Sequence, residues 1–207
     1  MLTGGGIIIC GGESKRMGRP KAWLPVGNET MLERVVRRLG EVVNPMVVVT
    51  AKGQSIPQLP TEVEIVCDQR PDAGPLEGIR VGLEALAEKV SWAFVTSCDV
   101  PSLQPGFVQA VCESLGDADV AVPVDPEYAH CLAAVYRTAI APRISELLDQ
   151  GKRRPLALYD VVRTVRIPVD TLREADSELV SLRNINTPES YEALLRQEGL
   201  ESEDPVC

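Results

Sequence analysis

The chain has 207 residues, enough for one α/β domain with a complete hydrophobic core. Hydrophobic residues make up 44% and charged residues 25%, which excludes collagen-like, mucin-like and disordered proteins. The net charge of -9 opposes binding to nucleic acid or anionic lipid. No apolar run reaches the roughly 18–20 residues of a membrane span, and residues 1–10 lack a signal-peptide pattern, so we expect a cytoplasmic protein.

The sulfur and imidazole side chains give no zinc-binding pattern. The chain has six cysteines and a single histidine, His130, and no two cysteines have CxxC spacing. A chain with a core of its own does not need a disulfide framework to fold. We therefore expect reduced thiols.

The first half of the chain alternates predicted strands and helices. Residues 6–10 are a continuous apolar run, typical of a strand buried on both faces, and a polar loop with glycines follows at 11–21. Thr30 and Glu33 have the spacing of a capping box, which predicts a helix over 30–39. Strands are predicted at 46–50 and 64–67, with a turn or short helix between them, and a helix at 75–89.

The second half continues this alternation. Strands are expected at 92–96, 119–124, 131–136 and 165–169, and helices at 105–115, 138–150 and 188–198. Repeated β–α–β units imply right-handed crossovers, so the predicted α/β fold is a Rossmann-like three-layer sandwich, a mostly parallel sheet with helices on both faces. In such sheets ligands bind beyond the C-terminal ends of the strands.

The loop after the first strand has the composition of a phosphate-binding loop. Gly11 and Gly12 let the backbone pass close to a ligand, and Ser14 adds a hydroxyl. Four cations, Lys15, Arg16, Arg19 and Lys21, follow within seven positions of a net-acidic chain. The alternative is a glycine turn with solvated basic residues. The loop matches neither GxxxxGK[ST] nor GxGxxG, which argues against a P-loop ATPase and a nicotinamide site.

The same loop resembles the GGxSxRMGxxK signature of nucleotidyltransferases, in which it holds a nucleoside triphosphate. Segments 68–79, 96–101, 130–136 and 184–191 continue the resemblance in order, and together they are similar to the molybdenum cofactor guanylyltransferases. The resemblance implies one nucleotidyltransferase domain over residues 1–200, with the nucleotide bound by the part up to roughly residue 100 and the pterin acceptor by the rest. Residues 201–207 would be an acidic tail.

The resemblance also implies a reaction. GMP would pass from GTP to the terminal phosphate of molybdopterin, with release of pyrophosphate and with Mg²⁺ as cofactor. The implied partners are these two small-molecule substrates, with transient contact to proteins that make or accept the cofactor. A phosphate monoester is already anionic near neutral pH, so positioning and charge neutralisation would suffice without a general base.

Site residues are carried over from the resemblance. Asp99, at a predicted strand end, is matched to the Mg²⁺ ligand, although an aspartate there could also cap the turn before Pro101. Arg16 and Lys21 are expected to clamp phosphates and, with Asp99, to be catalytic. The expected nucleotide-binding residues are Ile9, Cys10, Gly11, Gly12, Ser14, Arg16, Lys21, Thr50, Asp68, Gly74, Pro75, Gly78 and Asp99. Turn capping by Asp68 and helix packing by Gly78 are the alternatives.

The acceptor residues are expected in the second half. Asn184 and Asn186 would face the pterin, or their amides would cap the helix that follows. Arg153 and Arg154 would hold the terminal phosphate of the pterin, or would be a solvated helix end. His130 is an acceptor-binding candidate, or a structural hydrogen-bonding residue.

Three departures from the family pattern leave the base open. Cys10 stands where alanine is usual, Cys131 where proline commonly follows the histidine, and residues 19–21 resemble the CTP-using relatives as much as the GTP-using ones. The alternatives are therefore a cytidylyltransferase for molybdopterin or a nucleotidyltransferase with a sugar-phosphate acceptor. A further alternative is a nucleotide-binding module without catalysis.

Overall fold

The computed structural model describes residues 2–11, 20–70 and 73–200. At its centre is a seven-stranded sheet in the order β5-β4-β1-β6-β8-β7-β9. The strands are β1 (Gly5–Ile9), β4 (Met46–Thr50), β5 (Val63–Cys67), β6 (Trp92–Ser97), β7 (Val120–Val124), β8 (Ala134–Arg137) and β9 (Thr164–Pro168). Only β8 runs antiparallel to its neighbours in this sheet, so the expected mostly parallel α/β sheet is confirmed.

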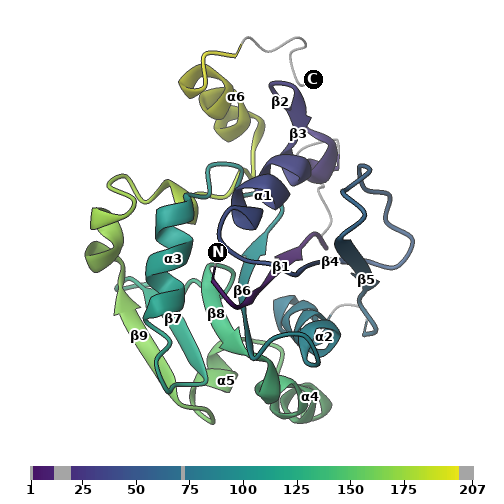
Figure 1. The fold of residues 1–207 in the computed structure, drawn as a ribbon, viewed down its shortest axis with the longest axis vertical. Helices are drawn as coiled ribbons and strands as arrows, with labels where there is room; N and C mark the ends of the chain where they lie inside the picture. Colours follow the sequence, from purple (N-terminus) through teal and green to yellow (C-terminus); the bar gives the residue numbers. More distant parts are fainter. Residues whose placement is uncertain (1, 12–19, 71–72, 201–207) are drawn as a thin grey trace.

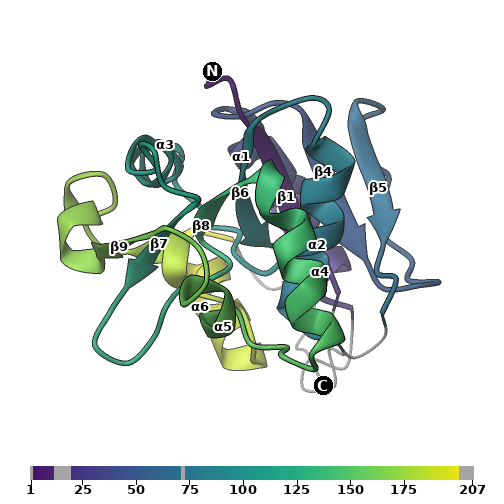
Figure 2. The same ribbon diagram turned by 90° about the horizontal axis from the view of Figure 1, so that it is seen from below.

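Helices cover both faces of the sheet, as Figures 1 and 2 show. One face packs against α1 (Met31–Gly40) and α3 (Pro105–Glu113), and the other against α2 (Pro75–Leu86), α4 (Ala141–Asp149) and α5 (Leu156–Tyr159). The strands β1 and β4 are buried along their whole length because helices lie on both sides of them. The layered fold predicted from the alternating pattern is confirmed.

Local signals set several helix starts where the sequence predicts them. The Thr30 hydroxyl accepts from the Glu33 backbone N–H at 3.3 Å, and the Thr30 N–H donates to the Glu33 carboxylate at 2.6 Å. This is the expected capping box of α1. Proline occupies the first turn of α2 and of α3, where its missing N–H costs nothing.

The structure corrects several predicted elements. The strand expected from residue 131 begins only at Ala134, because Cys131 and Leu132 lie in the turn before it. The segment expected to be one helix over 138–150 opens with the 3-10 helix η2 (Thr138–Ile140) before α4. The sequence reasoning missed α5, the hairpin of β2 (Pro25–Val26) and β3 (Glu29–Thr30), and the 3-10 helices η1 (Lys21–Trp23), η3 (Val169–Glu174) and η4 (Val180–Leu182).

A third apolar cluster joins residues 24–31 to the C-terminal helix of the described chain. Helix α6 (Pro188–Gln197) contributes Tyr191, Leu194 and Leu195, which pack with Leu24, Val26, Met31 and Ile185. The Tyr191 hydroxyl also donates to the Pro25 carbonyl. This packing brings the segment before α6 next to the segment before α1. Figure 1 shows α6 beside the β2–β3 hairpin, away from the main sheet.

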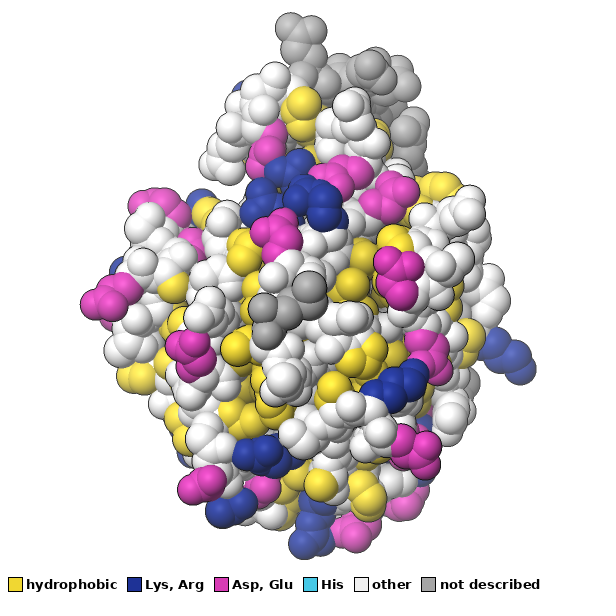
Figure 3. Space-filling model, in the orientation of Figure 1, with side chains coloured by type: hydrophobic (Ala, Val, Ile, Leu, Met, Phe, Trp, Pro, Cys, Tyr) yellow, Lys and Arg dark blue, Asp and Glu magenta, His cyan; other side chains and the backbone are white. Residues whose placement is uncertain are grey.

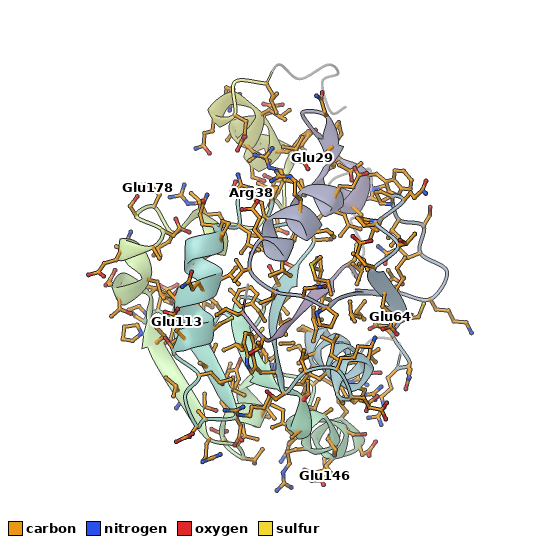
Figure 4. The ribbon with its side chains drawn as sticks, viewed as in Figure 1. Glu29, Arg38, Glu64, Glu113, Glu146 and Glu178 are labelled. Atoms are coloured by element: carbon orange, nitrogen blue, oxygen red, sulfur yellow. The ribbon has the colours of Figure 1, made fainter. Side chains whose placement is uncertain are left out.

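The basic side chains of α1 serve this same junction. Arg34 is 7% exposed and pairs with Glu198, directly after α6, at 2.5 Å. Arg37 pairs with Glu29 at 2.8 Å. Figure 3 shows Lys and Arg side chains, in dark blue, gathered over α1 among acidic ones, and Figure 4 labels Glu29 and Arg38 in this region. The cluster therefore ties α6 to α1.

No helix among the described residues combines the length and the apolar character that crossing a membrane requires.

Candidate active site

A cavity of about 180 Å³ opens at the C-terminal ends of the neighbouring strands β1 and β6. Six residues expected at the site line it: Ile9, Cys10, Gly11, Lys21, Asp99 and Asn184. They come from the ends of two strands, from η1 and from the segment before α6. The structure thus places one cavity where ligands bind in parallel α/β sheets.

Asp99 is held in the cavity wall by three polar side chains. It is 9% exposed, and its Oδ1 accepts from the Ser97 hydroxyl at 2.6 Å and from the Asn184 amide at 2.7 Å. Its Oδ2 accepts from the Lys21 ammonium at 2.7 Å. Several charged or polar donors on a nearly buried carboxylate offset its desolvation and fix its orientation.

Lys21 connects the end of the glycine loop to the segment before α6. Besides the ion pair with Asp99, its ammonium donates to the Asn186 Oδ1. The alternative in which Asn184 and Asn186 cap α6 is wrong, because the N-cap is Thr187, which forms a capping box with Ser190. The two asparagine amides are therefore directed to Lys21 and Asp99.

The predicted phosphate loop is only partly described. Gly12, Ser14 and Arg16 lie outside the described residues, as do Lys15 and Arg19. The Arg16 clamp therefore stays a prediction. Gly11 is described, and a methyl group added there would lie 3.3 Å from Asp68 Oδ2. The backbone of the loop thus passes close to a second carboxylate.

Asp68, directly after β5, has the features of an unsatisfied acceptor. Its Oδ1 is buried and lacks a hydrogen-bond partner among the described residues. Burial, and then the neighbouring Glu77, raise the pKa of this carboxyl, against a smaller lowering by Arg80. A buried acceptor without a partner is costly in a folded protein, and such groups gather at functional sites.

A buried ion pair supports the Asp68 loop. Glu77 is 1% exposed and accepts from Arg80 at 2.6 Å and from the Gln69 backbone N–H at 3.3 Å. Hydrogen bonds with Glu77 and Glu84 raise the pKa of Arg80 far above its usual range, despite burial. Sequence reasoning missed this network, although two charged residues on the buried side of α2 were a visible signal.

Four expected nucleotide contacts lie in the surrounding framework rather than in the cavity wall. The Thr50 hydroxyl is buried and donates to the Val66 carbonyl at 3.3 Å. Gly74 precedes α2 with a φ of 75°, and Pro75 is its first residue. Gly78 packs on β1, since a methyl group added there would lie 3.1 Å from Ile9 Cδ1. Their nucleotide contacts stay predictions, and the packing alternative for Gly78 is observed.

The remaining acceptor candidates lie apart from the Asp99 cluster. His130 Nε2 lies 2.8 Å from Asp125 Oδ2, and the pKa of Asp125 is lowered by backbone hydrogen bonds from Glu127 and Tyr128 and also by His130. Arg153 and Arg154 are exposed, after the end of α4. The Arg153 carbonyl is near Gly74, so this segment lies beside the start of α2. Their role toward an acceptor stays a prediction.

The structure adds cavity residues that the sequence reasoning did not identify. Ser97, Cys98, Gln54, Ala22 and Leu132 also line the cavity. Gln54 donates to the Cys10 carbonyl at 2.7 Å and so fixes the end of β1. Ser97 and Cys98 stand directly before Asp99, so their place in the motif was the available signal. A hydrogen bond with Cys10, followed by burial, raises the pKa of the Cys98 thiol well above its usual value.

The donor set limits what the site can bind. In the described part of the chain, no group of three or more His, Cys, Asp or Glu side chains could hold a metal ion. A hard cation at Asp99 would therefore need oxygens from a substrate, which is how Mg²⁺ is commonly bound beside phosphates. Gly11, a lysine and a strand-end carboxylate at one sheet edge define the class, a nucleotide-binding site of an α/β fold.

Comparisons with known proteins specify the class. The family model of the MobA-like NTP transferase domain matches residues 6–166. The chain is 37% identical over 196 residues to a probable molybdenum cofactor guanylyltransferase from Mycobacterium ulcerans, and the match covers 92% of each chain. It is 40% identical over 187 residues to a protein of the same name from Mycobacterium bovis, and that match covers 88% of each chain. The chain belongs to the MobA-like NTP transferase family.

A solved structure shows the same fold. It is the molybdopterin-guanine dinucleotide biosynthesis protein A from Archaeoglobus fulgidus, 23% identical, with a TM-score of 0.77. The match covers 94% of this chain and 98% of that one. The layered architecture therefore has a counterpart at nearly the full length of both chains.

Proposed function

We propose that this chain transfers GMP from GTP to the terminal phosphate of molybdopterin and releases pyrophosphate. The relatives at 37–40% identity are named for guanylyl transfer to this cofactor. The observation that carries the proposal is the contact of Lys21 with both Asp99 and Asn186. It joins a residue of the nucleotide loop, a strand-end carboxylate and an amide of the second half in one cluster.

The residues present fit a Mg²⁺ ion. The Lys21 ammonium lies 2.7 Å from Asp99 Oδ2, so positive charge is favourable at this oxygen. Ser97 and Asn184 hold the other oxygen, so Oδ2 is the oxygen that would hold the cation. Asp99 would hold the ion together with oxygens of the triphosphate and water. When bound, the ion would neutralise part of the charge of the triphosphate.

The chain's own groups then supply positioning and charge. Lys21, on a long flexible side chain, would turn from Asp99 toward the phosphates when the nucleotide enters. The backbone at Gly11 allows close approach, and the expected clamp of Arg16 would grip two phosphate oxygens. The acceptor phosphate is anionic near neutral pH and attacks the α-phosphorus in line, so the site needs no general base.

The two halves of the domain would hold the two substrates. We assign the nucleotide to the part up to roughly residue 100 and the pterin to the rest. Asn186 lies at the junction, where an amide suits a flat heterocycle rich in donors and acceptors. Arg153 and Arg154 would receive the terminal phosphate of the pterin, and His130 would line the same side.

The base preference rests on Asp68. Its buried Oδ1 accepts no hydrogen bond among the described residues, although the backbone at Gly11 is close. Guanine would present two adjacent N–H groups to the Asp68 carboxylate, whereas cytosine presents one amino group on its pairing edge. This supports GTP over CTP, the substrate of the closest alternative reaction.

The test is pyrophosphate release by the purified chain with molybdopterin and each of GTP, CTP and ATP. We expect release with GTP and little with CTP or ATP. Asp99→Asn, which keeps the shape of the side chain, should reduce turnover by about 100-fold, while circular dichroism remains that of the original chain. Preference for CTP would favour a cytidylyltransferase. No release with any nucleotide would contradict the proposed transfer and favour a binding module.

A further inference from the structure

Two thiols stand side by side at the ends of neighbouring strands. The parallel pairing of β1 with β6 matches Ile9 to Ser97, so Cys10 and Cys98 are the next residues along the two strands. The Cys98 N–H donates to the Ile9 carbonyl at 3.0 Å, which continues the ladder to this point. Strand neighbours lie about 4.8 Å apart, within the roughly 4.4–6.8 Å that separates the Cα atoms of a disulfide.

Both thiols point to the same face of the sheet. Cys10 and Cys98 belong to the apolar cluster under α1 and α3, together with Ile8 and Phe94 of the same strands. The Cys10 side chain is also close enough to raise the pKa of the Cys98 thiol. Two neighbouring residues on adjacent strands whose side chains share a face have the relative placement that a disulfide needs.

The pair is accessible through the cavity although both residues are nearly buried. Cys10 is 3% and Cys98 8% exposed, and both line the cavity that holds Asp99 and Lys21. An oxidant as small as hydrogen peroxide fits a cavity of about 180 Å³, where one water occupies about 30 Å³. Cys112 is also buried but lines a different cavity, whose lining contains no second cysteine among the described residues.

We propose that Cys10 and Cys98 are a redox modification site, which a peroxide converts to a reversible disulfide that closes the nucleotide site. The Cys10 sulfur attacks a peroxide oxygen, the O–O bond breaks, and a sulfenic acid and water form. The second sulfur then attacks the sulfenic sulfur, so the S–S bond forms, the S–O bond breaks and a second water leaves. The two thiols lose two electrons and two protons, and the peroxide gains both.

The effect on the nucleotide follows from the neighbours of the two cysteines. Cys10 precedes Gly11, and Cys98 precedes Asp99. A disulfide fixes the Cβ and sulfur atoms of both residues in one narrow geometry, so its formation would shift the two strand ends that carry Gly11 and Asp99. A displacement of about 1 Å in a positioning group can reduce the rate by about 100-fold. The disulfide would therefore weaken GTP binding and turnover together.

The experiment treats the purified full chain with hydrogen peroxide and measures two quantities. Peptide mass spectrometry without reduction should find the Cys10 peptide linked to the Cys98 peptide, with a mass lower by two hydrogens. Calorimetry with GTP should show affinity reduced by at least tenfold after oxidation and restored by dithiothreitol. Cys10→Ala and Cys98→Ala should each lose the linkage, and the ratio of oxidised to reduced affinity should approach one. Cys112→Ala should behave like the original chain.

The absence of the Cys10–Cys98 linkage would overturn the proposal. An equal loss of GTP affinity on oxidation in the original chain and in both alanine variants would overturn it as well. The GTP readout rests on the proposed function, whereas the linkage does not. If reduced protein binds no GTP, the proposed function fails while the linkage still decides whether the thiols form the modification site.

Discussion

Lys21 and Asp99 form an ion pair at 2.7 Å although 78 positions of sequence separate them. The pair exists because η1 begins at Lys21 and β6 ends just before Asp99, at the same edge of the sheet. Asn186 contacts the same ammonium. One lysine thus connects the nucleotide loop, the sheet and the segment before α6.

Lys21→Ala should lower kcat/KM for GTP by about 100-fold, because it removes the described cation closest to Asp99 and to the expected phosphates. Lys21→Arg should recover part of the loss, because the positive charge remains while a planar guanidinium replaces the compact ammonium. Steady-state kinetics of both variants measure this. An alanine variant with unchanged kcat/KM would remove Lys21 from the site.

Ser97 acts as a positioning residue for Asp99, through a hydrogen bond of 2.6 Å to Oδ1. Ser97→Ala should raise the Mg²⁺ concentration for half-maximal activity by about 10-fold, with a stability loss of about 1 kcal/mol. Ser114→Ala, whose hydroxyl donates to the Ala110 carbonyl of α3, is the matched control. Equal Mg²⁺ requirements in the two variants would show that Ser97 only contributes to stability.

Asp68→Asn should stabilise the protein without nucleotide at neutral pH. The folded state raises the pKa of this carboxyl, so its ionisation above the unfolded pKa costs stability, and the cost disappears below about pH 3.9. Thermal unfolding of both chains from pH 3.5 to 8 measures the difference, which should grow with pH. The same variant should bind GTP more weakly. A variant less stable at pH 8 than the original chain would contradict the buried, unpartnered Oδ1.

The Glu77–Arg80 pair should carry more of the stability than the pair of Arg80 with Glu84. Glu77 is 1% exposed, so Glu77→Gln leaves Arg80 partly uncompensated in the interior and should cost about 3 kcal/mol. The Glu84 side chain is 45% exposed, so Glu84→Gln should cost no more than about 1 kcal/mol. Urea unfolding gives both values. Equal losses of unfolding free energy in the two variants would show that the burial of Glu77 does not increase its contribution to stability.

Local sequence signals predicted the framework well because they act over few residues. The capping box of Thr30 and Glu33 sets the start of α1, and the apolar run at β4 matches its bounds. The antiparallel direction of β8 was not predicted, although residues 125–133 are too few for the crossover that a parallel pair needs. The short connection between β7 and β8 indicated their antiparallel direction, which the hydrophobic periodicity of the two strands does not indicate.

The site was predictable in part, for a physical reason. Lys21 and Asp99 stand in motifs that the resemblance covers, so their meeting could be expected. The contact of Asn186 with Lys21 depends on how α6 packs against the β2–β3 hairpin, through residues such as Tyr191 and Val26. The support of Asp68 by Glu77 likewise depends on tertiary packing. Such contacts follow from the assembled layers and not from spacing along the chain.

The most direct test of the account is a crystal structure of the chain with GTP and Mg²⁺. We predict the triphosphate over Gly11 at the ends of β1 and β6, with Lys21 on the phosphates and the ion between Asp99 and the phosphate oxygens. A nucleotide bound at another edge of the sheet, with the cavity beside Asp99 free of ligand, would contradict the account.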